Sequence, residues 1–159
     1  MALEYRLQIK SKLNLLNFVG KFLKENKISF SVENSNNCIN LYLCDILGFM
    51  ISILFSETVY FEYLIDKNEI VEEEWEYSSD LHFRLDKFCD NLKARMNMID
   101  ICIYILNNTN EDVKLLFNRD ILVLERNHSV ITINKNFGFW NSDELLNKIL
   151  LTKFQQNTN

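Results

Sequence analysis

Apolar and polar residues alternate one by one at the start of the chain, from Leu3 to Lys10. An alternation of period two predicts a strand with one buried face and one solvated face. A broad apolar stripe at helical spacing follows and continues to about Asn26, and Ser11 is placed to cap this helix. The first 26 residues therefore predict a strand followed by a helix.

Short runs with strand character fill the middle of the chain, separated by the turn cluster NSNN and by Gly48. The connections between these runs are too short for crossover helices, so an antiparallel meander is expected. The predicted strands are 28–32, 38–44, 50–55 and 58–65.

A strand over Leu81–Leu85 and then a long helix from Asp86 are predicted next. Apolar residues recur every three to four positions in this helix, namely Phe88, Leu92, Met96, Ile99, Ile103 and Leu106. The run IDICIYIL at 99–106 would also suit a strand because it is rich in isoleucine. As a helix, this run is apolar nearly all round and should be buried against a sheet.

Three short strands and a last helix complete the chain. NRD and RNHS supply hairpin turns between the strands, and Asn141 with Glu144 forms a capping-box pattern at the helix start. Aromatic residues at 137, 139 and 140 flank Gly138, and we expect them to fill the edge of the sheet against this helix. The three predicted strands are 113–117, 121–125 and 130–134.

Runs of strands with occasional helices indicate the α+β class, an antiparallel sheet with two main helices and a short C-terminal helix packed on it. The predicted order is β-α-β-β-β-β-β-α-β-β-β-α, with an acidic loop before the sixth strand, Leu81–Leu85. A length of 159 residues with 48% hydrophobic residues predicts one domain over 1–154 and a polar tail over 155–159. The N-terminus lacks the apolar stretch of a signal peptide, and Met98–Leu106 is too short to span a membrane, so a cytoplasmic protein is expected.

Charge is distributed unevenly along the chain, whose formal net charge is −5. Nine acidic residues and one basic residue, Lys67, lie between Glu57 and Asp80, so this segment carries −8 and the remainder +3. Phosphate binding needs clustered Lys and Arg, so direct nucleic-acid binding is not expected. A basic protein is the partner that such a segment would attract.

Candidate catalytic chemistry is sparse. The four cysteines form no CxxC pair and predict reduced thiols, and neither His82 nor His128 has a neighbour at metal-ligand spacing. Cys89 comes nearest to a reactive position, but Asp86 and Asp90 would oppose its thiolate. Three isolated glycines cannot build a phosphate loop, and the acidic run lacks the spacing of a calcium loop. No catalytic, cofactor or metal residues are therefore assigned, and a non-enzyme is predicted.

The stretch EIVEEEWEY, residues 69–77, combines acidic residues with large aromatic ones and permits two interpretations. It could be a solvated loop or edge strand in which Trp75 covers the edge of the core. It could also be a protein-binding surface, with aromatic anchors and glutamates that steer a basic partner. The candidate partner-binding residues are Glu69, Ile70, Glu72, Glu73, Glu74, Trp75, Glu76 and Tyr77.

Four stretches, ALEYRLQI (2–9), FRLDK (83–87), VKLLFNRDILVLER (113–126) and ITINKNFGFW (131–140), occur in this order before a short helix. The chain resembles, on these stretches, the swarming-inhibition (Sit) type immunity proteins of bacterial polymorphic toxin systems. The resemblance covers the first strand and most of residues 81–150.

The resemblance implies a cytoplasmic, non-enzymatic protein that binds and neutralises a cognate protein toxin. Many such toxins are nucleases with basic surfaces made for phosphate, and an inhibitor that mimics that charge would be acidic. The other interpretations are a protein-interaction domain with a different partner, and a small-molecule binder or enzyme. Free edges of an antiparallel sheet would permit either a monomer or a homodimer.

Overall fold

The computed structural model describes residues 2–54, 61–66, 69–73 and 75–152, and describes 61–66 and 69–73 as backbone only. Its strands form a single ten-stranded sheet. These strands are β1 (Leu3–Ile9), β2 (Val32–Asn34), β3 (Cys38–Leu43), β4 (Phe49–Leu54), β5 (Phe61–Asp66), β6 (Glu69–Glu73), β7 (Ser79–Leu85), β8 (Val113–Phe117), β9 (Ile121–Asn127) and β10 (Val130–Ile133).

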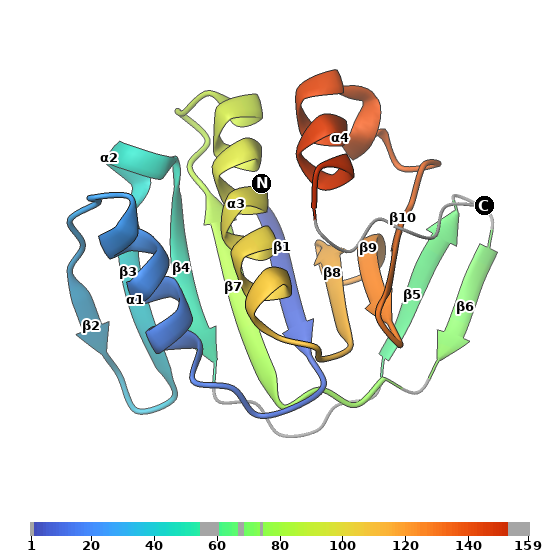
Figure 1. Ribbon diagram of the computed structural model, residues 1–159, viewed down its shortest axis with the longest axis horizontal. Coiled ribbons are helices and arrows are strands. Elements are labelled where there is room, and N and C mark those ends of the chain that lie inside the picture. The colour runs from blue at the N-terminus through green and yellow to red at the C-terminus, as the bar shows by residue number, and fades with distance from the viewer. Residues whose placement is uncertain (1, 55–60, 67–68, 74, 153–159) are drawn as a thin grey trace.

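The strands lie in the order β2-β3-β4-β7-β1-β8-β9-β5-β6, and β10 also pairs with β9. Every pairing among the described strands is antiparallel except that of β5 with β9, which consists of one register pair, Leu64 with Ile121. The centre of the sheet is therefore built by β7, β1 and β8, which come from three distant parts of the chain (Figure 1).

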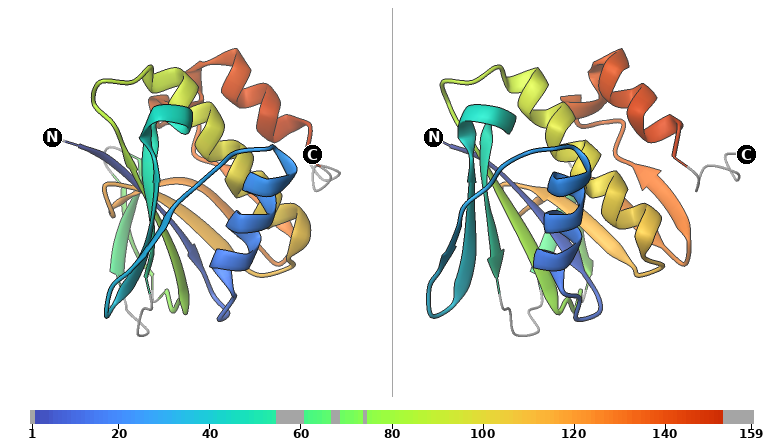
Figure 2. Two further views of the ribbon diagram at one scale, coloured as in Figure 1. Left: turned by 90° about the vertical axis from the view of Figure 1, so that its left-hand side faces the viewer. Right: turned by 60° about the vertical axis from the view of Figure 1, so that its left-hand side comes forward.

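Helices cover one face of this sheet. They are α1 (Leu15–Glu25), α2 (Cys44–Leu47), α3 (Asn91–Asn108), the 3-10 turn η1 (Gly138–Asn141) and α4 (Asp143–Leu150). The longer helices α1, α3 and α4 lie side by side on the same side of the sheet, and α2 sits at one end of β3 and β4 (Figures 1 and 2). The α+β class and the antiparallel sheet predicted from the sequence are confirmed.

The core lies between α3 and the central strands. The alternating residues Tyr5, Leu7 and Ile9 of β1 are all buried, as the period of two predicts. The isoleucine-rich run forms the second half of α3, with Ile99, Ile101, Cys102, Ile105 and Leu106 each at 0% exposure. Burial on nearly all sides explains why a run that would suit a strand is stable as a helix.

The aromatic residues around Gly138 belong to the core, as predicted. Phe139 and Trp140 are buried in η1, and Trp140 Nε1 donates a 2.9 Å hydrogen bond to the Val123 carbonyl on β9. This bond satisfies the indole N–H of a buried ring. It fixes η1, and with it the start of α4, against the sheet.

Arg126 connects the end of α3 to β9 although its side chain is only 1% exposed. Its guanidinium donates to the carbonyls of Leu106 (2.6 Å) and Glu111 (2.7 Å) and to Thr109 Oγ1 (2.9 Å). The last carbonyls of a helix lack intrahelical partners, so a buried charged donor here closes the helix end.

The predicted meander of four consecutive strands is wrong in its last member. β2, β3 and β4 pair in sequence, but β4 then pairs with β7, and β5 lies beyond β9 on the other side of the sheet. The region predicted as an acidic loop also contains β6, which pairs with β5. Short connections favour neighbouring strands, but here the long-range pairs around β1 and β7 determine the order.

Helix starts differ by a few residues from those expected. Asn14, not Ser11, caps α1 by accepting a 3.1 Å bond from Asn17 N–H, and Ser142, not Asn141, caps α4. Asp90 caps α3, so the turn before it leaves Phe88 outside the helix and 85% exposed. The expectation that Phe88 belongs to the buried stripe is wrong because the helix begins three residues later, at Asn91. The tail at 155–159 lies outside the described residues.

Candidate functional site

The predicted partner-binding segment begins along a free edge of the sheet. Glu69–Glu73 forms β6, the outermost strand at that end, and Glu74 lies outside the described residues. The backbone register places Glu62 opposite Glu72 and Asp66 opposite Glu69. Like charges directly opposite each other weaken a strand pair. Negative charge is thus concentrated here at a cost to the hairpin's own pairing.

Trp75 and Tyr77 follow this strand and are buried, at 7% and 5% exposure, while Glu76 between them is exposed. The Trp75 ring lies 5.0 Å from Lys114 Nζ on β8, and Ser78 N–H donates a 3.0 Å bond to the Ile9 carbonyl. The segment therefore runs from the edge hairpin back onto the central strands. Both rings are buried, but neither belongs to the main core cluster, so Trp75 does not cover the edge of the core between the sheet and the helices. A partner-binding role for the segment remains a prediction.

Trp75 and Tyr77 lie close to a layer of charged residues on the face of the sheet that the helices leave uncovered. Arg6 pairs with Asp80, whose side chain has no exposed surface, and Lys114 Nζ lies 2.6 Å from Glu125 Oε2. Burial raises the pKa of Asp80, and the neighbouring Arg6 guanidinium opposes that rise. Charges removed from water in this way require partners, and the cross-strand register supplies them.

His82 belongs to the same layer, since it lies opposite Arg6 on β1 and Ser52 on β4. Its Nε2 is 3.4 Å from Glu4 Oε2. Burial lowers the pKa of His82, and Glu4 opposes this effect. The ring is largely enclosed between neighbouring strands, with 18% of its side-chain surface exposed.

The thiols show no sign of activation. All four cysteines are free, and Cys102 is fully buried while Cys38, Cys44 and Cys89 are half-buried. Burial, followed by the charge of Asp86, raises the pKa of both Cys44 and Cys89. A raised pKa leaves the thiol protonated at neutral pH, and the protonated form is a poor nucleophile.

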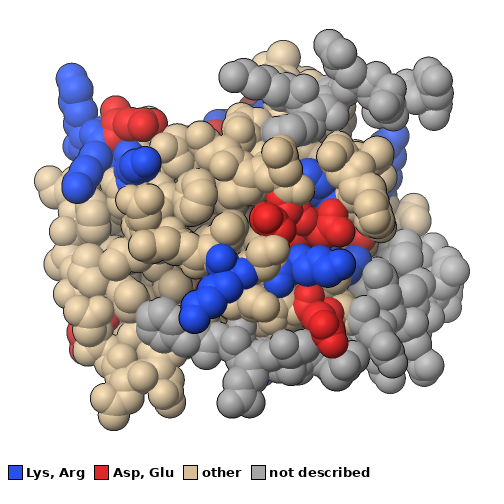
Figure 3. Space-filling view, turned by 60° about the horizontal axis from the view of Figure 1, so that its bottom comes forward, with Lys and Arg blue, Asp and Glu red and all other residues tan. Residues whose placement is uncertain are grey.

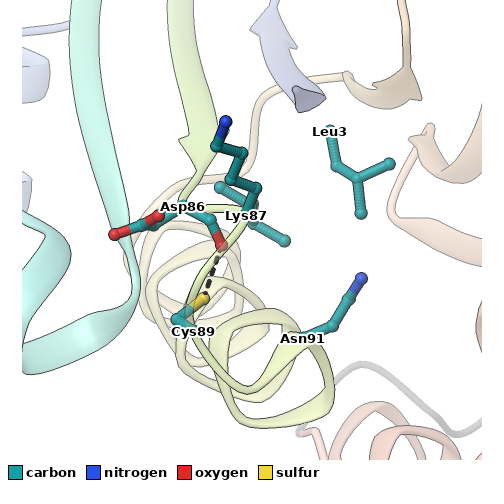
Figure 4. Close-up of a pocket in the computed structure, with 6 residues that line it drawn as sticks. Leu3, Asp86, Lys87, Cys89 and Asn91 are labelled. Carbon is teal, nitrogen blue, oxygen red and sulfur yellow. Dashed lines mark hydrogen bonds between the residues drawn. The ribbon is translucent and has the colours of Figure 1, made fainter. Parts of the chain in front are cut away.

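A shallow pocket of about 190 Å³ opens beside the turn that precedes α3 (Figure 4). It is lined by Leu3, Leu85, Asp86, Lys87, Cys89 and Asn91. The Cys89 thiol donates to the carbonyls of Asp86 (2.9 Å) and Gly48 (3.3 Å), so it is occupied by backbone contacts. Within the described residues, no three His, Cys, Asp or Glu side chains are arranged to hold a metal ion.

The described surface is mixed in charge. Viewed toward the lower end of the sheet, acidic and basic side chains lie next to one another (Figure 3).

A family model described as SitI3-like matches residues 3–144, which is most of the chain and includes its central strands. The chain belongs to the SitI3-like family. This confirms the resemblance to Sit-type immunity proteins and extends it through the middle section. Membership of the SitI3-like family indicates an immunity protein and points away from an enzyme. No curated protein and no solved structure matches the chain.

None of the helices in the described part of this SitI3-like chain is long and apolar enough to cross a membrane. Sequence reasoning missed one surface feature, the pair of exposed apolar residues Ile46 and Phe88, at 51% and 85% exposure. Phe88 fitted a helical stripe, and Ile46 fell in a stretch predicted as a turn. Asp90 caps the start of α3, and this capping residue two positions after Phe88 was the signal that could have placed Phe88 outside the helix.

Proposed function

We propose that this chain neutralises a cognate protein toxin by stoichiometric binding in the cytoplasm, with the acidic segment Glu69–Tyr77 as part of its contact surface. The observation that carries this proposal is the family match over residues 3–144. The proposal needs no catalytic group in the chain, because a bound inhibitor acts by occupying its target.

The distribution of charge supports a basic toxin. Residues 57–80 carry −8, and five of the nine acids in this segment lie in the edge strands β5 and β6. A nuclease toxin would present clustered Lys and Arg to bind phosphate, and an acidic edge would match that surface. Such matching chiefly raises the rate of association and excludes partners of the wrong charge.

The like-charged register of the hairpin supports the same choice of surface. The backbone register places Glu62 opposite Glu72 and Asp66 opposite Glu69, so acidic residues occupy facing positions on both strands. A cationic partner would complement such a row of like charges. The exposed Glu76 extends the same charge to the end of the strand.

Co-expression tests the function. The toxin gene adjacent to this chain's gene is induced in a sensitive host with and without the chain, and growth is followed. We expect the chain to restore growth and to elute with the toxin as one complex in gel filtration. Growth arrest that is unchanged by the chain would contradict the proposal.

A charge-reversal variant tests the surface separately. Glu72, Glu73, Glu74 and Glu76 are changed to Lys while Trp75 is retained, since Trp75 is buried. The matched control reverses four exposed acids elsewhere, at Glu25, Glu33, Asp120 and Asp143. We expect the first variant to lose protection and the control to keep it. Equal protection by both variants would show that Glu69–Tyr77 is not part of the contact surface. It would not contradict neutralisation of the toxin by binding.

A further inference from the structure

Phe88 is an unusually exposed aromatic residue for this chain. Among the described residues, Phe88 and Leu151 are the most exposed large apolar side chains, at 85% each. An exposed phenyl ring gains nothing from burial in the free protein. Because the rings predicted as anchors, Trp75 and Tyr77, are buried, the exposed aromatic anchor of this chain has to be sought elsewhere.

The turn that carries Phe88 is held rigidly. Phe88 N–H donates a 2.9 Å bond to Asp86 Oδ1, and Asp86 N–H donates a 2.9 Å bond to the Gly48 carbonyl. That carbonyl also accepts from the Cys89 thiol. A Cβ at Gly48 would lie 3.0 Å from Cys89 Sγ, so the turn packs directly on the end of α2. A ring presented on a fixed backbone loses little conformational freedom when a partner covers it.

Ile46 extends this apolar surface from the neighbouring element. It lies on α2, is 51% exposed, and α2 adjoins the turn in every view of the molecule (Figures 1 and 2). The turn itself contributes Asp86, Lys87 and Cys89 to the pocket that Leu3 and Leu85 also line (Figure 4). The turn that carries Phe88 thus adjoins both α2, which bears the exposed Ile46, and a hollow in the surface.

Three carboxylates lie near Phe88 in the chain or on the adjoining helix α2. Two of them accept a backbone N–H, Asp86 from Phe88 and Asp90 from Lys93. Asp45, Asp86 and Asp90 form no ion pair within 4 Å in the described part of the chain. Of the two nearby lysines, Lys87 lies over the Phe88 ring, with Nζ 4.8 Å from its centroid, and Lys93 is exposed in the first turn of α3. The carboxylates that lack ion pairs are complemented best by Lys or Arg side chains of another molecule.

We propose that Phe88, with Ile46, is the apolar anchor through which this chain binds the toxin, and that the toxin offers an apolar pocket rimmed by Lys or Arg. This inference rests on the proposed function. It concerns a surface at the end of the sheet that bears α2, which is distinct from the edge strands β5 and β6 (Figure 1). The edge hairpin would then attract the toxin, and the Phe88 turn would hold it.

Phe88→Ser and Leu151→Ser form a matched pair, because both wild-type side chains are exposed to the same extent and neither contributes to the core. The probe is the catalytically inactive form of the toxin encoded next to this chain's gene, and its dissociation constant is measured by calorimetry. We expect Phe88→Ser to weaken binding by at least roughly 30-fold, the loss typical of a hot-spot residue, and Leu151→Ser to leave binding unchanged. Ile46→Ser should weaken binding to a lesser extent.

Thermal melts establish first that each variant is folded. Wild-type affinity in Phe88→Ser would overturn the anchor while the proposed function stands, since wild type still binds. Failure of the wild-type chain to bind the toxin would overturn both. A change in self-association of Phe88→Ser in sedimentation, with toxin affinity unchanged, would assign the ring to a second copy of the chain and also overturn the inference.

Discussion

Arg6 on β1 pairs with Asp80 on β7, and this carboxylate has no exposed surface although it lies on the sheet face that the helices leave uncovered. Both oxygens of Asp80 are engaged, and Arg6 Nε lies 3.3 Å from Oδ1. The pair lies in the central two strands of the sheet. At the centre of the uncovered face, therefore, charged side chains are paired with each other and largely removed from water.

Replacing Arg6 by Met should therefore destabilise the fold strongly. The change leaves a buried carboxylate without its counter-ion, which costs about 3–5 kcal/mol in other proteins. The free energy of unfolding is measured by urea denaturation at neutral pH. The double variant Arg6→Met with Asp80→Leu removes both charges and should recover much of the loss. Equal stability of wild type and Arg6→Met would show that the pair contributes nothing.

Trp75→Phe should be tolerated, whereas Trp75→Ala should not. The ring is 7% exposed, so truncation to Ala leaves a cavity and should cost about 3–5 kcal/mol. The buried Trp75 Nε1 has no hydrogen-bond partner among the residues that the structure describes, so Phe gives up none of the described hydrogen bonds. Thermal unfolding of the two variants gives the comparison. A loss of stability well below this range in Trp75→Ala would mean that the ring does not pack against the sheet in solution.

Gly48→Ala should destabilise the chain, and Gly20→Ala should stabilise it. Gly48 has φ +88°, and a Cβ there would meet Ala94 Cβ at 2.9 Å. At Gly20, inside α1, a Cβ meets its nearest neighbour at 3.8 Å, an ordinary contact. Alanine in a helix interior is favoured over glycine by up to about 1 kcal/mol, while strain at a positive φ costs about as much or more. Opposite shifts in melting temperature are expected, and shifts of the same sign would contradict these local geometries.

Acid sensitivity should arise in part from His82. Burial lowers its pKa in the folded chain below the ordinary value of 6.5, so the unfolded state binds more protons at mildly acidic pH. The contribution of His82 to stability is present above about pH 6.5 and is lost progressively as pH falls from there through the lower pKa of the folded state. His82→Gln should show a smaller loss of unfolding free energy between about pH 7.5 and pH 5.5 than wild type. His128→Asn, which changes an exposed turn residue, should keep the wild-type loss.

Local patterns in the sequence were sufficient to predict an element correctly where that element buries one face. The alternation from Leu3 to Ile9 predicted β1, and the isoleucine-rich run was correctly placed as a helix buried against the sheet. The aromatic residues after Gly138 were correctly placed in the core. In each case the burial of a single face, or of nearly the whole surface of the element, is visible in the sequence as a pattern of apolar residues.

The pairing of strands that are distant in the sequence produces no such local pattern and was not predicted. The position of β5 beyond β9 depends on contacts between segments more than fifty residues apart, for which no residue of β5 gives a local signal. β6 was absent from the predicted element order, although an edge strand was one interpretation of EIVEEEWEY. Glutamate-rich sequence disfavours strands by propensity, whereas pairing with β5 depends on backbone bonds. Of the candidate site, the sequence showed the concentration of charge but not the burial of Trp75 and Tyr77, because one segment's composition does not reveal what packs against it.

Inhibition of the toxin titrated with the purified chain tests the central claim most directly. The toxin's activity is held at a concentration far above the dissociation constant while the chain is added in steps. Stoichiometric binding predicts a linear loss of activity that is complete at about one chain per toxin molecule. Activity that is unaffected at excess chain, or complete inhibition at a small fraction of an equivalent, would contradict neutralisation by binding.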